Sequence, residues 1–198
     1  MNKSGLSDED FSHLPINERI IQGKDIGEYF IKEQLSSHGI VITKVPDDMD
    51  KYQKIDGKWN DEYVQIKLRK SGMQYRNDIA YEVCRNHNRN IRLQEQLKNT
   101  NKQGRDYKGK VVHYFVMNKE ETEIYHVLAK DIKTFVEDTI NELNQDFSAK
   151  GCLKKLFKGK NQTELRPTFD KDPKSFTPSK VMAFIPVEKV IQNKYQIK

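Results

Sequence analysis

Three polar residues, Asp56, Gln65 and Lys67, are spaced in a way that suits chemistry on a phosphate ester. Asp56 begins an expected strand, and Gln65 and Lys67 lie in the middle of the strand expected to return along it. Since successive side chains of a strand point to opposite faces, Gln65 and Lys67 share one face. The apolar residues beside them, Val64 and Ile66, are expected to face the core. Two polar groups on one face of an otherwise apolar strand indicate a functional role.

The chemistry that these residue types favour is metal-dependent hydrolysis of a phosphodiester bond. A hard cation such as Mg²⁺ or Mn²⁺ takes oxygen ligands, which the Asp56 carboxylate, the Gln65 side-chain carbonyl and the backbone carbonyl of Ile66 would supply. The ion would polarise the phosphate and help to form hydroxide from water. Lys67 would orient or deprotonate that water and offset the charge growing on the phosphate. The expected cofactor is therefore Mg²⁺ or Mn²⁺.

A helix, a strand and a hairpin are expected to position these residues. Apolar or small side chains at three and four spacing predict a helix over residues 17–37, with Gly39 following its end as a C-cap glycine. A strand is expected over 40–45. The turn dipeptide Asn60-Asp61 then indicates a hairpin between the strands expected at 54–59 and 63–68.

The rest of the chain continues with alternating strands and helices. Further elements are expected as a strand at 79–83, a helix at 91–97, strands at 111–117 and 123–127, a helix at 130–143 and a last strand at 181–187. This order predicts the α/β class, with a mixed sheet flanked by helices. Domain organisation is expected to be a polar lead-in at 1–16, a core at 17–143, and a basic, proline-containing elaboration at 144–198 whose final strand rejoins the core.

The ordered set of these residues resembles the PD-(D/E)XK nuclease superfamily, which includes restriction endonucleases and Holliday junction resolvases. Its core pattern is an acidic residue, a hairpin and then acidic-x-Lys, preceded by a helix that often donates a glutamate. Asp56 matches the first acid, Lys67 the lysine, and Glu28 the helix glutamate. The resemblance covers residues 17–83 and implies a PD-(D/E)XK-like core, with Glu28, Asp56 and Gln65 as metal ligands and Lys67 beside them in catalysis.

The departure from the family pattern is Gln65, which stands where the second acid usually is. Glutamine is neutral, so the site has one fewer negative charge to hold its cation. The resemblance therefore implies a Mg²⁺-dependent endonuclease, a deoxyribonuclease by expectation. A catalytically inactive protein of the same fold, acting as a nucleic-acid-binding or assembly module, stays open. A third reading is a structural domain whose basic surface serves protein contacts.

Basic residues cluster directly after the candidate site and could hold phosphates on both sides of the cut. The expected nucleic-acid contacts are Arg69, Lys70, Arg76, Arg85, Arg89 and Arg92. A second basic stretch, residues 154–160, is either a further contact or a solvated loop. The expected partner is nucleic acid, with DNA favoured over RNA. Whether the chain forms a homodimer stays open.

Composition limits the remaining classes. The chain has 198 residues, of which 35% are hydrophobic and 32% charged, and its net charge is +6. Such a chain can bury one small core, and its positive charge favours a polyanionic partner. The sequence contains no run of about 18 apolar residues, so no membrane span is predicted. The first residues lack the apolar segment of a secretory signal. Cys84 and Cys152, which have no metal-ligand spacing, indicate free thiols in a reducing, cytoplasmic compartment.

The same residues also have ordinary structural readings. Asp56-Gly57 alone is a common turn dipeptide. A Gln-x-Lys pattern is frequent on the solvated face of an antiparallel sheet, and Glu28 alone would pass as a solvated helix residue. The order and spacing of all four residues together favour the nuclease reading. The histidines show no ligand spacing, and His113, in an expected core strand, is expected to be structural.

Overall fold

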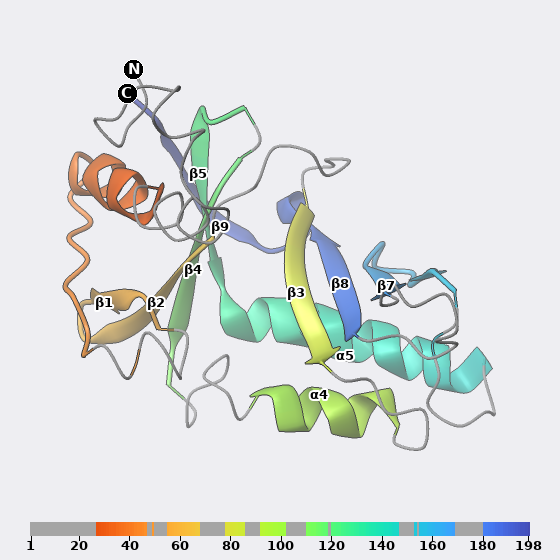
Figure 1. The fold of residues 1–198 in the computed structure, drawn as a ribbon. Helices are drawn as coiled ribbons and strands as arrows, with labels where there is room; N and C mark the ends of the chain where they lie inside the picture. Colours follow the sequence, from red (N-terminus) through yellow and green to blue (C-terminus); the bar gives the residue numbers. More distant parts are fainter. Residues whose placement is uncertain are drawn as a thin grey trace, which may run out of the picture.

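Two β-sheets and the helices beside them make up the fold in the computed structural model (Figure 1). The residues that the structure describes are 27–46, 49, 55–67, 78–85, 92–101, 110–118, 120–146, 153, 155–168 and 180–198. The α/β class is therefore confirmed.

The first sheet has five strands in the order β1-β2-β4-β5-β9. Their bounds are Gly57–Trp59 (β1), Glu62–Lys67 (β2), Val112–Met117 (β4), Glu123–Leu128 (β5) and Ile191–Gln196 (β9). Strands β2 and β4 are parallel and the other pairs are antiparallel, so this sheet is mixed. The connection from β2 to β4 has to cross over, as parallel pairs require, and it includes β3 and α4.

The second sheet is antiparallel throughout and has the order β3-β8-β7-β6. Its strands are Asp78–Arg85 (β3), Phe157–Lys158 (β6), Glu164–Thr168 (β7) and Lys180–Pro186 (β8). Helix α4 (Leu93–Asn101) contacts β3, and helix α5 (Ala129–Asp146) contacts both sheets through β4, β5 and β8. A 3-10 turn, η2 (Val187–Lys189), leads from β8 into β9.

Residues 27–36 are helical, and the helix ends where the sequence predicts. Gly39 has φ +80°, a conformation that glycine adopts without strain. The N–H of Gly39 donates to Ser36 O and that of Ile40 to Leu35 O, at 2.9 and 3.0 Å. This pair of bonds is a Schellman motif, and the buried side chains of Leu35 and Ile40 belong to one apolar cluster. The first half of the expected helix, 17–26, lies outside the described residues.

The predicted hairpin forms around Asn60 and Asp61. Both residues have positive φ, 50° and 62°, as a type I′ turn requires. The turn joins β1 to β2 in the register Trp59↔Glu62 and Lys58↔Tyr63. The hairpin was therefore readable from a dipeptide whose side chains tolerate left-handed backbone.

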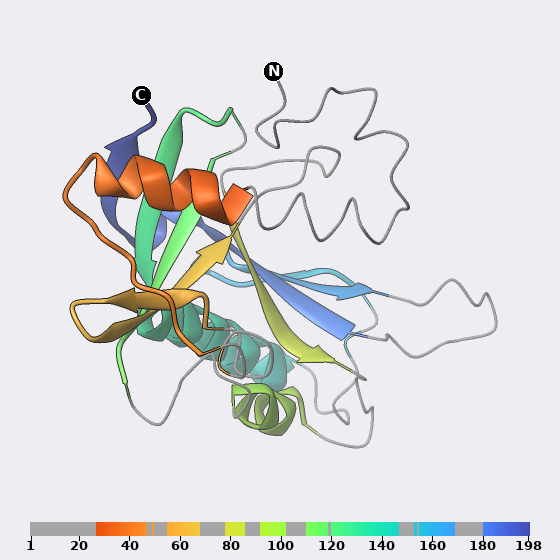
Figure 2. The ribbon, with the colours of Figure 1, turned by 60° about the vertical axis from the view of Figure 1, so that its left-hand side comes forward.

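Both faces of β2 are covered by apolar clusters. Val64 and Ile66 pack with Ile31 and Leu35 of helix 27–36. Tyr63 belongs to the other cluster, which contains the buried face of α5. The two clusters lie on opposite faces of the first sheet, because neighbouring residues of one strand contribute to both. Figure 2 shows helix 27–36 and α5 on opposite sides of this sheet.

Three expectations about strands were wrong. Residues 40–45 form only an isolated bridge, Thr43↔Lys58, instead of a strand. Strands β3 and β8, expected in one mixed sheet, form a second sheet. The strand ending the chain is β9, not the one expected at 181–187, and it pairs with β5.

Candidate functional site

Asp56 lies directly before β1, and its carboxylate continues the hairpin ladder. Its backbone N–H donates to Val64 O at 2.8 Å. The backbone N–H of Ile66 donates to Oδ2 of Asp56 at 2.6 Å. Since β1 begins only at Gly57, this side-chain oxygen takes the place of the next rung. A bond from an N–H to a carboxylate is stronger than a neutral one, so the orientation of the Asp56 side chain is fixed by β2.

Gln65 and Lys67 share one face of the hairpin, and Asp56 lies beside them, directly before β1. The β1–β2 register ends at Gly57↔Val64, and the N–H of Asp56 donates to the carbonyl of the same Val64, so the regular pairing does not continue to Asp56. Lys67 follows Gln65 at the strand period of two. This is the face of Tyr63 and the α5 cluster, and Val64 and Ile66 point away from it.

This face is buried, in contrast to the solvated face on which a Gln-x-Lys pattern is usually found. Gln65 is only 1% exposed and Asp56 only 7%. Lys67 is half-buried, and its Nζ lies 5.9 Å from the ring centroid of Tyr114. Tyr114 is the partner of Gln65 in the parallel β2–β4 register. The lysine thus extends from the covered part of the face with an aromatic ring beside its ammonium group.

The side-chain amide of Gln65 is unusual for a buried group. Within the described part of the chain its Nε2 atom has no hydrogen-bond partner. Leaving a buried polar group unpaired costs about 1–3 kcal/mol. The nitrogen and oxygen of an amide are assigned from the hydrogen bonds around them, and exchanging the two would direct a carbonyl oxygen toward the same unpaired position. That position suits a cation, so Gln65 fits the role of an uncharged oxygen ligand.

Glu28 comes from a different element and from the other side of the sheet. It shares the helix stripe of Ile31 and Leu35, which packs on Val64 and Ile66, and it is only 8% exposed. The first turn of helix 27–36 lies near the end of β2 in Figures 1 and 2. Glu28 therefore belongs to the helix that covers the Val64 and Ile66 face of the sheet, opposite to the face of Gln65.

Lys32 connects this helix to the hairpin. Its Nζ donates to the backbone carbonyl of Asp56 at 3.0 Å. Glu28 and Lys32 are four residues apart and thus neighbours on the helix surface. The contact fixes the helix beside Asp56, and Glu28 lies one helical turn from Lys32 on the same helix. Lys32 was not predicted from the sequence, although its spacing from Glu28 was the available signal.

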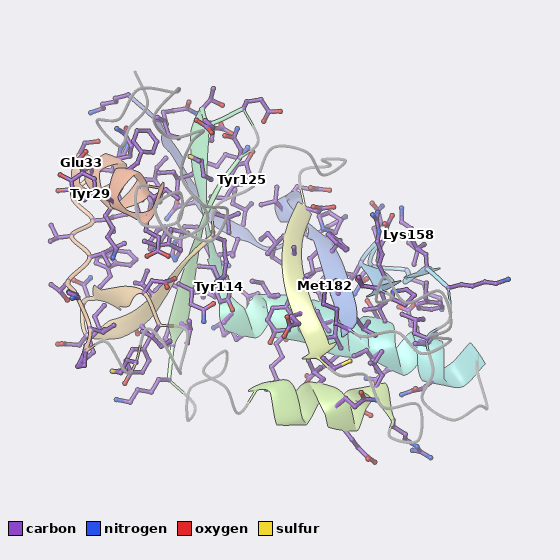
Figure 3. The ribbon with its side chains drawn as sticks, viewed as in Figure 1. Tyr29, Glu33, Tyr114, Tyr125, Lys158 and Met182 are labelled. Atoms are coloured by element: carbon purple, nitrogen blue, oxygen red, sulfur yellow. The ribbon has the colours of Figure 1, made fainter. Side chains whose placement is uncertain are left out.

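The outward surface of the same helix is exposed and takes no part in this arrangement. Tyr29 and Glu33 are joined by a 2.6 Å hydrogen bond from the phenol to the carboxylate. Figure 3 shows both at the edge of the molecule, pointing away from the sheet. The carboxylate raises the pKa of Tyr29, and the inward side of the helix remains the one that bears on the site.

The residues expected to bind nucleic acid are only partly described. Arg92 is exposed and directly precedes α4. Arg85 ends β3, so its backbone belongs to the second sheet and not to the hairpin. Arg69, Lys70, Arg76 and Arg89 lie outside the described residues.

The predicted structural role of His113 agrees with its contacts. His113 Nε2 bonds to Glu62 Oε2 at 2.6 Å, and its Nδ1 bonds to His126 Nε2 at 2.8 Å. The Trp59 ring packs edge-on against both imidazoles. Burial, and then the charge of His113, lower the pKa of His126 to about 4. This network joins β2, β4 and β5 on the face opposite to Gln65.

Cys84 is a buried thiol. Burial raises its pKa to about 11. A thiol that stays protonated is a poor nucleophile, so the chemistry of the chain is not expected to involve this residue.

Within the described ranges no three His, Cys, Asp or Glu side chains are grouped as metal ligands. The candidate ligand set contains two carboxylates, Glu28 and Asp56, and its third side chain is an amide.

No described helix is long and apolar enough to cross a membrane. Comparison with protein-family models, curated proteins and solved structures finds no match for this chain.

Proposed function

We propose that this chain is a metal-dependent nuclease that hydrolyses phosphodiester bonds in nucleic acid, with DNA as the expected substrate and a PD-(D/E)XK-like core. The observation that carries the proposal is the hairpin arrangement, in which Ile66 N–H fixes the Asp56 carboxylate at 2.6 Å beside the strand that carries Gln65 and Lys67. A structural turn aspartate would have no need of a buried amide and a lysine beside it. The contact of Lys32 with Asp56 adds a helix that carries Glu28.

The ligands for a divalent cation would be Asp56 and Gln65 at the edge of β2. Glu28, the third expected ligand, would have to reach round the end of this strand from the other face of the sheet. The N–H and C=O of one strand residue point to the same side, so the carbonyl of Ile66 points toward Asp56, as its N–H does. It is an additional oxygen donor at this edge. A bound Mg²⁺ or Mn²⁺ supplies charge stabilisation for the phosphate and activation of water. These are the oxygen types that such ions accept.

Lys67 supplies the positive charge that belongs to the chain itself. Lys67 follows Gln65 by two residues on the same face of β2, and its ammonium group lies beside the Tyr114 ring. From this position it would orient the attacking water and offset the negative charge that develops on the phosphate. The two lysines of the site, Lys32 and Lys67, match the formal charge of the two carboxylates. Because Gln65 adds no charge, metal affinity is expected to be modest.

The second candidate is a non-catalytic nucleic-acid-binding or assembly module of the same fold. The glutamine at position 65 favours it, since a weak cation site is one route to lost catalysis. Nicking of supercoiled plasmid DNA separates the two. The nuclease proposal expects nicking by the wild type with Mg²⁺ or Mn²⁺ and none with a chelator or in Asp56→Asn. If the wild type binds DNA but does not nick it in the presence of any divalent cation, only the second candidate remains.

A further inference from the structure

Two lysines from different segments lie against a single aromatic ring on the face of the candidate site. Lys58 Nζ and Lys110 Nζ are each 5.7 Å from the ring centroid of Tyr63. Lys58 is the partner of Tyr63 across the hairpin. Lys110 precedes β4, and the N–H of Tyr63 donates to Val111 O at 3.2 Å. Three segments of the chain thus bring two ammonium groups to one ring.

We propose that Lys58 and Lys110 form a phosphate-binding patch that holds the nucleic-acid backbone beside the candidate site. The inference rests on the proposed function, because it assigns the substrate-binding surface of that same site. Tyr63 and Gln65 lie on one face two residues apart, about 7 Å along the strand. The patch therefore lies next to the position at which a phosphate would be cleaved, and on the same face.

The arrangement of the two lysines favours an anion as the ligand. Tyr63 is only 7% exposed, so its ring is a fixed support against which the lysine stems pack. One ammonium beside a tyrosine face is stabilised by the ring, but two on the same ring also repel each other. An anion bound by both removes that repulsion. Lysine ammonium groups hold phosphates as point charges, without reading the base sequence.

The other basic segment of the chain has a different environment. Lys158 lines a cavity of about 310 Å³ together with Asp78, Glu164 and Glu188. Figure 3 shows Lys158 beside the second sheet, on the opposite side of the molecule from β1 and β2. The three carboxylates in that cavity would repel a phosphate. Exposed lysines of this segment, Lys155 and Lys160, thus provide a matched control that removes the same charge away from the site.

The test is the affinity of the full chain for a fluorescein-labelled 20-base-pair DNA duplex. It is measured by fluorescence anisotropy in a chelator at several salt concentrations between about 50 and 200 mM. The variants are Lys58→Ala/Lys110→Ala and the control Lys155→Ala/Lys160→Ala. Loss of two phosphate contacts should weaken binding at least about 10-fold at the lowest salt. It should also reduce the slope of log K against log salt by about 2, since each contact contributes about 0.9. The control should retain the affinity and slope of the wild type.

Unchanged affinity and slope in Lys58→Ala/Lys110→Ala would overturn the proposal, as would a wild type that does not bind the duplex. A loss confined to the control would move the surface to the second sheet and overturn it equally. Lys58→Gln/Lys110→Gln, which keeps long polar side chains, should reproduce the loss if charge is its cause. Because no metal is present, this result is independent of catalysis. Binding through the two lysines, together with no nicking of plasmid DNA in a separate assay with Mg²⁺ or Mn²⁺, would support the patch and count against the nuclease proposal.

Discussion

The backbone N–H of Ile66 donates to Oδ2 of Asp56 at 2.6 Å, which makes a side chain outside β1 part of the hairpin ladder. The bond sets the direction of the carboxylate beside the strand that carries Gln65 and Lys67. It also gives Asp56 a structural role in addition to the chemical one proposed for it. Substitutions at this position should therefore affect both stability and activity, and the two effects can be measured separately.

Replacing Asp56 by alanine should abolish metal-dependent cleavage and lower the free energy of unfolding by about 1–3 kcal/mol, because the buried N–H of Ile66 loses its acceptor. The fold should persist, since the backbone bond from Asp56 to Val64 remains available. Urea unfolding gives the stability and plasmid nicking the activity. Asp56→Asn, which retains an acceptor oxygen, should recover part of the stability and none of the activity. Retained cleavage in both variants would exclude Asp56 as a ligand.

Lys67 should matter for rate more than for stability. Lys67→Met keeps the aliphatic stem and removes the ammonium group. The rate of cleavage should fall by about 10² to 10⁴, the range for loss of a positioned proton-transfer group. Lys130→Met, at an exposed position at the start of α5, is the matched control and should cleave as the wild type does. Equal rates in the two variants would show that the Lys67 ammonium has no part in the reaction.

Gln65→Glu should tighten metal binding, because it adds a charge to a ligand set of two carboxylates and one amide. Calorimetric titration with Mg²⁺ and Mn²⁺ should give a lower Kd than for the wild type, and cleavage should be equal or faster. Gln65→Leu, which offers no oxygen, should bind metal more weakly than the wild type. A Gln65→Glu variant that gains no metal affinity would place the cation elsewhere.

Stability should depend on pH through His126. Its pKa is lowered to about 4 in the fold by burial and by His113, against about 6.5 in the unfolded chain. Between these values the unfolded chain binds a proton that the fold does not, so stability is complete above pH 6.5 and declines as pH falls toward 4. The contribution of this histidine approaches about 1.4 kcal/mol per pH unit in that window. His126→Gln should unfold with a shallower pH dependence than the wild type, whereas identical slopes would contradict the assignment.

Local signals in the sequence were sufficient for the hairpin and the end of the first helix. Asn60-Asp61 and Gly39 tolerate the positive φ that their turns need, so a few residues determined each structure. The spacing of Gln65 and Lys67 likewise placed these two residues on one face before any pairing was known.

The second sheet could not be predicted because strand pairing is non-local. The alternation in β3 and β8 indicates strands, but nothing in either segment states that they pair with each other instead of with β2 or β4. Strand β7 was not predicted because it contains Pro167, which pairs with Val181 of β8. The partner strand β6 extends only to Leu165 on the other side, so the missing N–H disrupts no bond there. Strand β9 is mostly polar and exposed, as edge strands often are.

The segment expected as a strand at 40–45 shows a different limit. Gly57 approaches it so closely that a Cβ atom would lie 2.4 Å from Ile42 Cγ2 and 2.8 Å from Thr43 O. The glycine lets the segment cross β1 at one bridge, Thr43↔Lys58, instead of running along it. An apolar run bounded by Pro46 predicts extended backbone but does not give the length over which it pairs. The burial of Gln65 could not be predicted from the sequence near it, because the α5 cluster that covers its face comes from distant parts of the chain.

The central claim is that Asp56 and Gln65 bind one divalent cation at the edge of β2. The most direct measurement is anomalous diffraction from crystals of the wild-type chain soaked in Mn²⁺, with crystals of Asp56→Ala soaked in parallel. The account predicts one strong anomalous peak in the wild type, bonded to a carboxylate oxygen of Asp56 and to the amide oxygen of Gln65, and no such peak in the variant. A wild-type crystal without a peak at these two residues, or a peak that persists in Asp56→Ala, would contradict it.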